Sequence, residues 1–153
     1  MSEKVKHIYR VKTIHGPNLN LLGTRETQIY GSETLTTINQ KLTVLAQKEN
    51  VFIDFFQSNH EGELIDVLQN AHDYHGFLFN PAAYTHTSIA LRDTLLAMNK
   101  PFVEIHLSDI NQREDFRKKS YFSDIALAIE FGKGAQSYYD GFTRLINHLK
   151  GDK

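Results

Sequence analysis

Short apolar runs alternate along this chain with longer segments of helical period, and this alternation restricts the fold more than any other feature. The runs lie at Val11–Ile14, Val51–Phe56, Phe77–Phe79, Phe102–Leu107 and within Ile125–Phe131. They lack the polar alternation of half-exposed strands, so we expect a sheet covered by helices on both faces. Strands that alternate with helices are joined by right-handed crossovers into parallel sheets. The sequence therefore predicts an α/β, doubly wound fold with a five-stranded parallel sheet.

The segments between these runs carry apolar stripes at spacings of three and four residues. In the first stripe the apolar positions are Leu35, Ile38, Leu42 and Leu45. Similar stripes occupy 64–71, 91–98 and 142–149. This spacing is typical of amphipathic helices. Ser32 or Thr34 is suited to cap the first of them, because a hydroxyl accepts a hydrogen bond from the opening helical turn.

The chain has 153 residues with no repeat or linker, so we expect a single domain over residues 1–153.

One connection is longer than the others between the predicted strands and helices. The segment His15–Glu33 has nineteen residues, whereas a βα loop usually has about two to six. A long loop at the carboxyl end of a strand is typical of an active-site lid. We predict such a lid at about 18–31.

Composition excludes several classes of function. Seventeen Lys and Arg residues balance eighteen Asp and Glu residues, and the basic residues are scattered. A nucleic-acid-binding protein needs a concentrated positive face, so none is expected. The chain has no cysteine, which excludes disulfides, thiolate nucleophiles and Cys-ligated zinc. The opening segment MSEKVKHIYRVK is too charged for a signal peptide, and no run is long enough to span a bilayer. We therefore expect a cytoplasmic location.

Polar side chains follow four of the predicted strands, at the edge where ligands bind in open parallel sheets. They are Asn18, Asn20, Arg25 and Tyr30; Ser58, Asn59, His60 and Glu61; Asn80, Tyr84, Thr85 and His86; and Glu104, His106, Ser108, Arg113 and Arg117. Glu104 and His106 are two apart on a strand, so they face the same way. This set favours acid–base and hydrogen-bonding chemistry, without an obvious nucleophile or metal-binding motif.

Each of these residues also has a structural interpretation. A guanidinium about 4 Å from a phenolate is worth roughly 4 kcal/mol at an effective dielectric of about 20, so Arg25 is able to activate Tyr30. Alternatively, Tyr30 packs the loop and Arg25 faces water. His106 is equally suited to a hydrogen-bonded place in the core, His86 to supporting a turn, and Asn18 to forming one.

A surface pair and a strand aspartate complete the alternatives. His72 and His75 have only Asp73 as a nearby carboxylate, so we interpret them as solvated surface and expect no metal site. Asp54 lies within its strand, whereas a phospho-acceptor is expected at the strand's carboxyl end. No hydroxyl-rich phosphate loop of the kind expected for flavin binding follows the first strand. A flavin-binding or phospho-accepting signalling module of the same doubly wound fold remains the alternative to an enzyme.

The strand-end motifs resemble those of the type II 3-dehydroquinate dehydratase family. The matching blocks are GPNLNLLGTRE at 16–26, YGS at 30–32, QSNHEGELID at 57–66, NPAAYTHTSIALRD at 80–93 and EIHLSDINQREDFRKKSY at 104–121. The resemblance implies a flavodoxin-like fold and the reversible anti elimination of water from 3-dehydroquinate, through an enolate, in the shikimate pathway. It also implies that neither a metal nor a cofactor takes part.

The resemblance assigns catalytic roles to five residues. Tyr30 is the base, Arg25 favours its phenolate form, and Asn18 holds a water against the enolate oxygen. His106 protonates the departing hydroxyl, with Glu104 beside it. A second enzyme mechanism, a Schiff base on lysine, has only Lys118 and Lys119 near these loops.

The resemblance also assigns substrate-binding positions and an assembly. The binding positions are Asn80, His86, Arg117 and the Leu107–Ser108 backbone, with Arg113 near the mobile region. Asp93 reaches the site of a neighbouring subunit, in a dodecamer built from four trimers. Three positions depart from the usual pattern: His15 replaces Asn, Ala82 replaces Gly and Asp109 replaces Asn.

Overall fold

The computed structural model describes residues 9–24, 26–30 and 32–151, with only the backbone of Tyr30. Five strands form one sheet in the order β2-β1-β3-β4-β5, and every neighbouring pair is parallel. The strands are β1 (Tyr9–His15), β2 (Val51–Gln57), β3 (Gly76–Asn80), β4 (Phe102–Ile105) and β5 (Ala128–Glu130). The predicted five-stranded parallel sheet is confirmed. The fourth strand ends at Ile105, two residues before the predicted end at Leu107.

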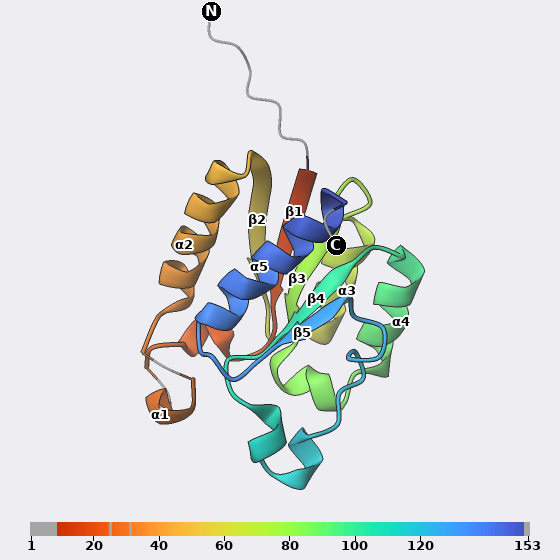
Figure 1. The fold of residues 1–153 in the computed structure, drawn as a ribbon. Coiled ribbons are helices and arrows are strands. Elements are labelled where there is room, and N and C mark those ends of the chain that lie inside the picture. The colour runs from red at the N-terminus through yellow and green to blue at the C-terminus, as the bar shows by residue number, and fades with distance from the viewer. Residues whose placement is uncertain (1–8, 25, 31, 152–153) are drawn as a thin grey trace, which may run out of the picture.

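Helices cover both faces of this sheet (Figure 1). The helices are α1 (Thr27–Tyr30), α2 (Leu35–Lys48), α3 (Glu61–Gln69), α4 (Ile89–Met98) and α5 (Gln136–Leu149). Helices α2 and α5 pack on one face, while α3 and α4 pack on the other. Each pair buries its own apolar cluster against the sheet, which is why the strands are apolar on both sides.

Two hydroxyl caps fix where the helices begin. The Thr34 side chain accepts a hydrogen bond from the backbone N–H of Thr37 at the start of α2, so the second of the two predicted caps is the one used. The Ser88 side chain accepts from Leu91 N at 3.0 Å and starts α4. These caps satisfy N–H groups that have no partner within the helix. No described helix is long and apolar enough to cross a membrane.

The predicted long connection between β1 and α2 contains local structure. A 3₁₀ helix at Leu19–Leu21 and the short α1 occupy it, and Leu19 and Leu22 are buried. At its start, Gly16 donates its N–H to the Asn80 carbonyl at 2.8 Å. A Cβ atom on Gly16 would lie 2.4 Å from the Pro81 carbonyl oxygen. Glycine therefore lets the loops after β1 and β3 leave the sheet side by side.

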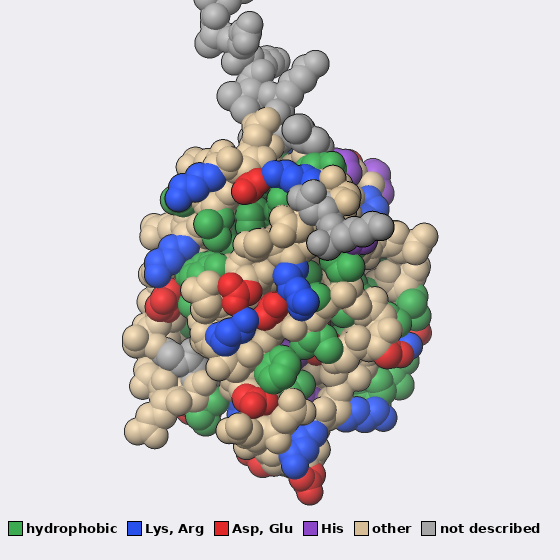
Figure 2. Space-filling model, viewed as in Figure 1, with side chains coloured by type: hydrophobic (Ala, Val, Ile, Leu, Met, Phe, Trp, Pro, Cys, Tyr) green, Lys and Arg blue, Asp and Glu red, His purple; other side chains and the backbone are tan. Residues whose placement is uncertain are grey.

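Charges of both signs are interspersed over the face formed by α2 and α5 (Figure 2). Lys133 lies 2.8 Å from Glu130 and 2.5 Å from Asp140, and Arg144 also pairs with Glu130. Lys41 pairs with Glu33 at the side of α2. This face therefore has short-range ion pairs in place of a field of one sign.

Candidate active site

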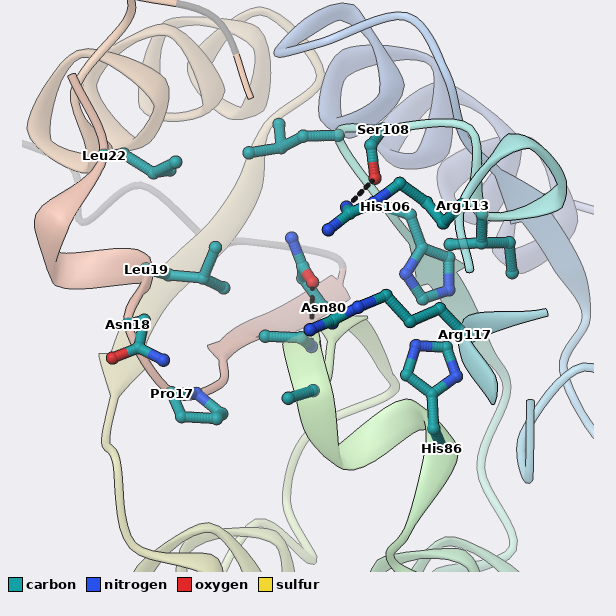
Figure 3. Close-up of a pocket in the computed structure, with 14 residues that line it drawn as sticks. Pro17, Asn18, Leu19, Leu22, Asn80, His86, His106, Ser108, Arg113 and Arg117 are labelled. Atoms are coloured by element: carbon teal, nitrogen blue, oxygen red, sulfur yellow. Dashed lines mark hydrogen bonds between the residues drawn. The ribbon is translucent and has the colours of Figure 1, made fainter. Parts of the chain in front are cut away.

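A pocket of about 120 Å³ opens at the carboxyl ends of β1, β3 and β4 (Figure 3). Its lining comes from the loops that follow these three strands. Eight predicted site residues line it: Asn18, Asn80, His86, His106, Leu107, Ser108, Arg113 and Arg117. The remaining lining residues are Pro17, Leu19, Leu22, Ala82, Ala83 and Ile110. The predicted convergence of these loops is confirmed.

His106 and Glu104 form a buried pair beneath the pocket. Nε2 of His106 lies 2.5 Å from Oε2 of Glu104, and the two residues are 5 % and 0 % exposed. Two hydroxyls complete the carboxylate's surroundings, because Ser120 donates to Oε2 at 2.8 Å and Ser123 donates to Oε1 at 2.7 Å. The carboxylate thus accepts three hydrogen bonds, which satisfies a buried charge that would otherwise be costly.

These contacts fix the protonation of Glu104. Burial raises the pKa of the carboxyl, but the hydrogen bond and charge of His106 and the bonds from Ser123 and Ser120 outweigh it, so the pKa lies below its usual value. Glu104 is therefore an anion, and Nε2 of His106 carries the proton between them. The other ring nitrogen, Nδ1, is left for a bound molecule. It donates when His106 is protonated and accepts when it is neutral.

A backbone carbonyl holds His86 in the pocket wall. Its Nδ1 lies 2.6 Å from the carbonyl oxygen of Lys119, so Nδ1 donates to that oxygen. Burial lowers the pKa of His86, and His106 and Arg117 act in the same direction, against the Lys119 carbonyl and Glu104. His86 therefore ties the turn after β3 to the backbone at Lys119, and it also lines the pocket.

Two guanidinium groups give the pocket a positive wall (Figure 3). Arg113 donates through Nη1 to the Ser108 hydroxyl at 3.2 Å. Glu114 lies 3.0 Å from Nε of Arg117 and 3.8 Å from Nε of Arg113. Both guanidinium groups line the pocket, and a guanidinium is suited to bind an anionic group on the ligand.

Two asparagines shape the backbone at the pocket's other edge. Asn18 has a φ of 68°, a left-handed conformation that asparagine tolerates better than most residues. Its N–H donates to the Asn59 side chain at 2.9 Å. Asn80 accepts at Oδ1 from the N–H of Ala82 at 3.1 Å and so fixes the turn that leads to His86. Asn18 is therefore both a turn residue and part of the lining.

Several predicted residues are not brought to this pocket. Asp93 is exposed on α4 and does not line it. The residues after β2 do not line it either, because β1 lies between β2 and the pocket. Arg25 and the side chain of Tyr30 lie outside the described residues. His75 accepts at Nδ1 from the N–H of Arg10, and among the described residues no cluster of three or more His, Asp or Glu is placed to hold a metal ion.

Four supporting residues were not predicted from the sequence. Ser120 and Ser123 hold Glu104, while His15 and Tyr138 lie behind Asn80. Both serines follow a long irregular stretch that has no periodicity. Tyr138 occurs within an amphipathic helix as one more core residue. The sequence signal for these serines was the position of Glu104, which faces the same way as His106 on a buried strand. A buried carboxylate needs further hydrogen-bond donors, so such donors were to be sought elsewhere in the chain.

A parallel sheet in this strand order, with an acid–base pocket at its carboxyl edge, defines a flavodoxin-like α/β enzyme. The family model "Dehydroquinase class II" matches residues 9–146. The chain belongs to the class II dehydroquinase family, as its motifs predicted.

Relatives of known sequence and structure agree with this assignment. A 3-dehydroquinate dehydratase of Francisella tularensis subsp. novicida is 52% identical over 139 residues, 91% of this chain and 95% of that protein. One from Francisella philomiragia is 54% identical over the same shares. The crystal structure of a type II dehydroquinase from Butyrivibrio crossotus matches with a TM-score of 0.87 and 36% identity, covering 90% of this chain and 97% of that one.

Proposed function

We propose that this chain dehydrates 3-dehydroquinate to 3-dehydroshikimate, with His106 as the acid that protonates the departing hydroxyl. The reaction follows from membership of the family, whose relatives bear this activity in their names. The chain is then a hydro-lyase of the shikimate pathway, which leads to aromatic amino acids. The observation that carries the assignment of His106 is its bond to a buried, ionised Glu104 at the base of a positively lined pocket.

The chemistry fits this arrangement. A hydroxyl two bonds from a ketone leaves readily once an enolate has formed, so the protein needs a base, an acid and groups that stabilise the oxyanion. Nδ1 of protonated His106 gives its proton to the hydroxyl oxygen, and the C–O bond breaks to release water. Glu104 keeps its charge and steadies the imidazolium through Nε2, in the manner of other buried His–carboxylate pairs.

The substrate's carboxylate suits the positive side of the pocket. Arg117 and the backbone of Leu107–Ser108 bind it, and Arg113 flanks it. Asn80 and His86 bind the ring hydroxyls. The lining of the pocket by all of these residues supports these roles.

The base comes from the predicted lid, residues 18–31. Tyr30 takes the proton from the carbon beside the ketone, and Arg25 stabilises its phenolate form. Asn18 holds a water against the enolate oxygen. The place of Asn18 on the pocket wall supports a lid in this position. Because base and acid come from different loops, they are able to act on opposite faces of the ring, as an anti elimination requires.

The assembly is part of the proposal. Residues 1–153 form one domain, which works in the cytoplasm as a dodecamer of four trimers. Asp93 completes the site of a neighbouring subunit. Its exposure on α4, away from its own pocket, supports this role.

Two rival functions have less support. A Schiff base needs a lysine in the pocket, and none of the described lining residues is a lysine. A signalling module needs a free strand-end acceptor, whereas Asp54 lies within β2, accepts from Tyr74 and pairs with Lys12.

Mixing the purified chain with 3-dehydroquinate tests the proposal. We expect the enone absorbance of 3-dehydroshikimate to rise without any added cofactor, after dialysis against a chelator, and borohydride to trap no adduct. Absence of the enone signal under these conditions would overturn the assigned reaction. A borohydride adduct on lysine would overturn the mechanism alone.

A further inference from the structure

A chain of buried hydrogen bonds runs from α2 to the pocket wall. Nε2 of His15 lies 2.9 Å from Oδ1 of Asn39, and its Nδ1 lies 2.8 Å from the Tyr138 hydroxyl. Nδ2 of Asn80 donates to the same hydroxyl at 3.0 Å. Oδ1 of Asn80 then accepts from the N–H of Ala82 at 3.1 Å. The four side chains come from α2, β1, α5 and β3, so the chain ties the α2–α5 layer and the sheet to the site.

The inner members of this chain are shielded from water. His15 and Tyr138 are fully buried and Asn80 is 3 % exposed. Among the four side chains only Asn80 lines the pocket. His15 packs its ring parallel to that of Phe55, with centroids 6.3 Å apart, and this fixes its plane. A buried polar chain of this kind has one satisfactory arrangement, because each unpaired group would be costly.

The donors and acceptors determine the direction of every proton in it. The amide nitrogen of Asn80 only donates, so the Tyr138 oxygen accepts from it. Oδ1 of Asn39 only accepts, so Nε2 of His15 carries the ring proton and donates it to Asn39. In the neutral ring Nδ1 is then an acceptor, and it receives the hydroxyl proton of Tyr138. Burial lowers the pKa of His15 to about 4, against the hydrogen bond to Asn39, which agrees with a neutral ring.

The same argument fixes the orientation of the Asn80 amide. A reversed amide would turn its NH₂ group toward the N–H of Ala82, placing donor against donor. In the observed orientation one amide hydrogen goes to Tyr138. The second hydrogen on Nδ2 is left for an acceptor in the pocket.

We propose that His15, acting through Tyr138, is a positioning residue that holds Asn80 with one amide N–H directed to an acceptor oxygen of the substrate. This inference rests on the proposed function and adds a determinant of substrate binding to it. The acceptor is a hydroxyl or carboxylate oxygen, because the amide offers only a donor. The Tyr138 hydroxyl acts on the substrate only through Asn80.

Variants of the two hidden residues separate this role from simple packing. Tyr138→Phe removes the acceptor of the Asn80 N–H, and His15→Leu leaves the Tyr138 hydroxyl proton without its acceptor, so in both variants the Asn80 amide is held less firmly. A binding group that acts equally in the ground and transition states changes KM and leaves kcat. We expect KM for 3-dehydroquinate to rise about tenfold in both variants, with kcat within about threefold. His15→Asn places Oδ1 where Nδ1 stood and should keep KM within about twofold, because the acceptor for Tyr138 remains.

Leu68→Ala is the matched control, since it removes fully buried apolar volume on the other face of the sheet. It should lower the unfolding temperature and leave KM unchanged. Unchanged KM in folded Tyr138→Phe and His15→Leu would overturn the inference, as would an equal rise in Leu68→Ala. If neither variant folds, the ¹⁵N resonances of His15 in the unaltered protein decide, because an Nδ1–H tautomer contradicts the chain. A wild-type protein that does not turn over 3-dehydroquinate contradicts the proposed function instead.

Discussion

Nε2 of His106 lies 2.5 Å from Oε2 of Glu104, whose carboxylate is completely buried. The Glu104 carboxylate accepts hydrogen bonds from Ser120, Ser123 and this ring. The imidazole is thereby fixed in one plane, with Nδ1 left for the pocket. The pair gives the site an acid that is able to carry a positive charge in a buried place, because the counter-charge is already there.

Glu104→Gln should lower kcat by roughly 10²-fold or more, within the range for a disabled acid or base. The neutral amide keeps the shape of the side chain but no longer balances an imidazolium. Steady-state enone formation measures the change. Glu130→Gln is the control, since it removes a carboxylate that pairs with Lys133 and Arg144 away from the pocket, and it should retain activity. Retention of near-normal kcat in Glu104→Gln would show that the pair has no catalytic part.

Ala82→Gly should stabilise the fold. Ala82 has a φ of 52°, and a left-handed conformation costs a non-glycine residue about 1–2 kcal/mol. The greater conformational freedom of glycine in the unfolded chain offsets about 0.4–1 kcal/mol of this gain in stability. We expect a net gain of up to about 1.6 kcal/mol and an unfolding temperature higher by up to about 6 °C. Ala83→Gly, at a neighbouring position with negative φ, should lower that temperature, and a rise in both variants would refute the explanation.

Acid should weaken the fold through His15. Burial lowers its folded-state pKa to about 4 from the usual 6.5, so the unfolded chain binds the proton first as the pH falls. The contribution of neutral His15 to the free energy of unfolding is therefore complete above pH 6.5 and is lost as the pH falls toward 4. Linkage gives a loss of about 2 kcal/mol between pH 7 and pH 5. Denaturant unfolding of wild type and His15→Asn at several pH values measures it. Equal pH slopes in the two proteins would contradict this origin.

Activity should depend on assembly. Asp93 is the fifth residue of α4, which begins at Ile89. A helix rises about 1.5 Å per residue, so Asp93 lies about 6 Å along the axis from the start of α4. Asp93→Ala should weaken both the trimer and catalysis, because a residue shared across a closed interface serves both. Light scattering on a dilution series, with activity assayed on the same samples, measures the two together. Asp66→Ala, an exposed aspartate of α3, is the control. A fully active monomer would refute the prediction.

Local patterns in the sequence predicted most of the fold. The apolar runs gave all five strands, and the stripe from Leu35 to Leu45 gave α2 together with its Thr34 cap. The site's edge followed from the rule that parallel strands bring their carboxyl ends together. The residues after β2 follow the carboxyl end of their strand, as expected, but they do not line the pocket. Strand order explains this, because β2 is an edge strand separated from β3 and β4 by β1.

The supporting contacts of the site could not be predicted because they join distant parts of the chain. His15 meets Tyr138 across 123 positions, and no local period relates them. Ser123 reaches Glu104 from a stretch without regular structure. Such contacts depend on how whole layers pack, whereas the nearness of Glu104 to His106 depends only on strand alternation.

His106→Ala tests the central claim most directly. We expect kcat for 3-dehydroquinate to fall by roughly 10²–10⁴, the usual contribution of a positioned acid or base. The variant should still fold, with a lowered unfolding temperature, because Glu104 loses one of its three hydrogen bonds but keeps those from Ser120 and Ser123. Substrate binding should persist, since the other pocket residues remain. Near-normal turnover would contradict the role of His106 as the acid, and an unfolded variant would show that its part is structural.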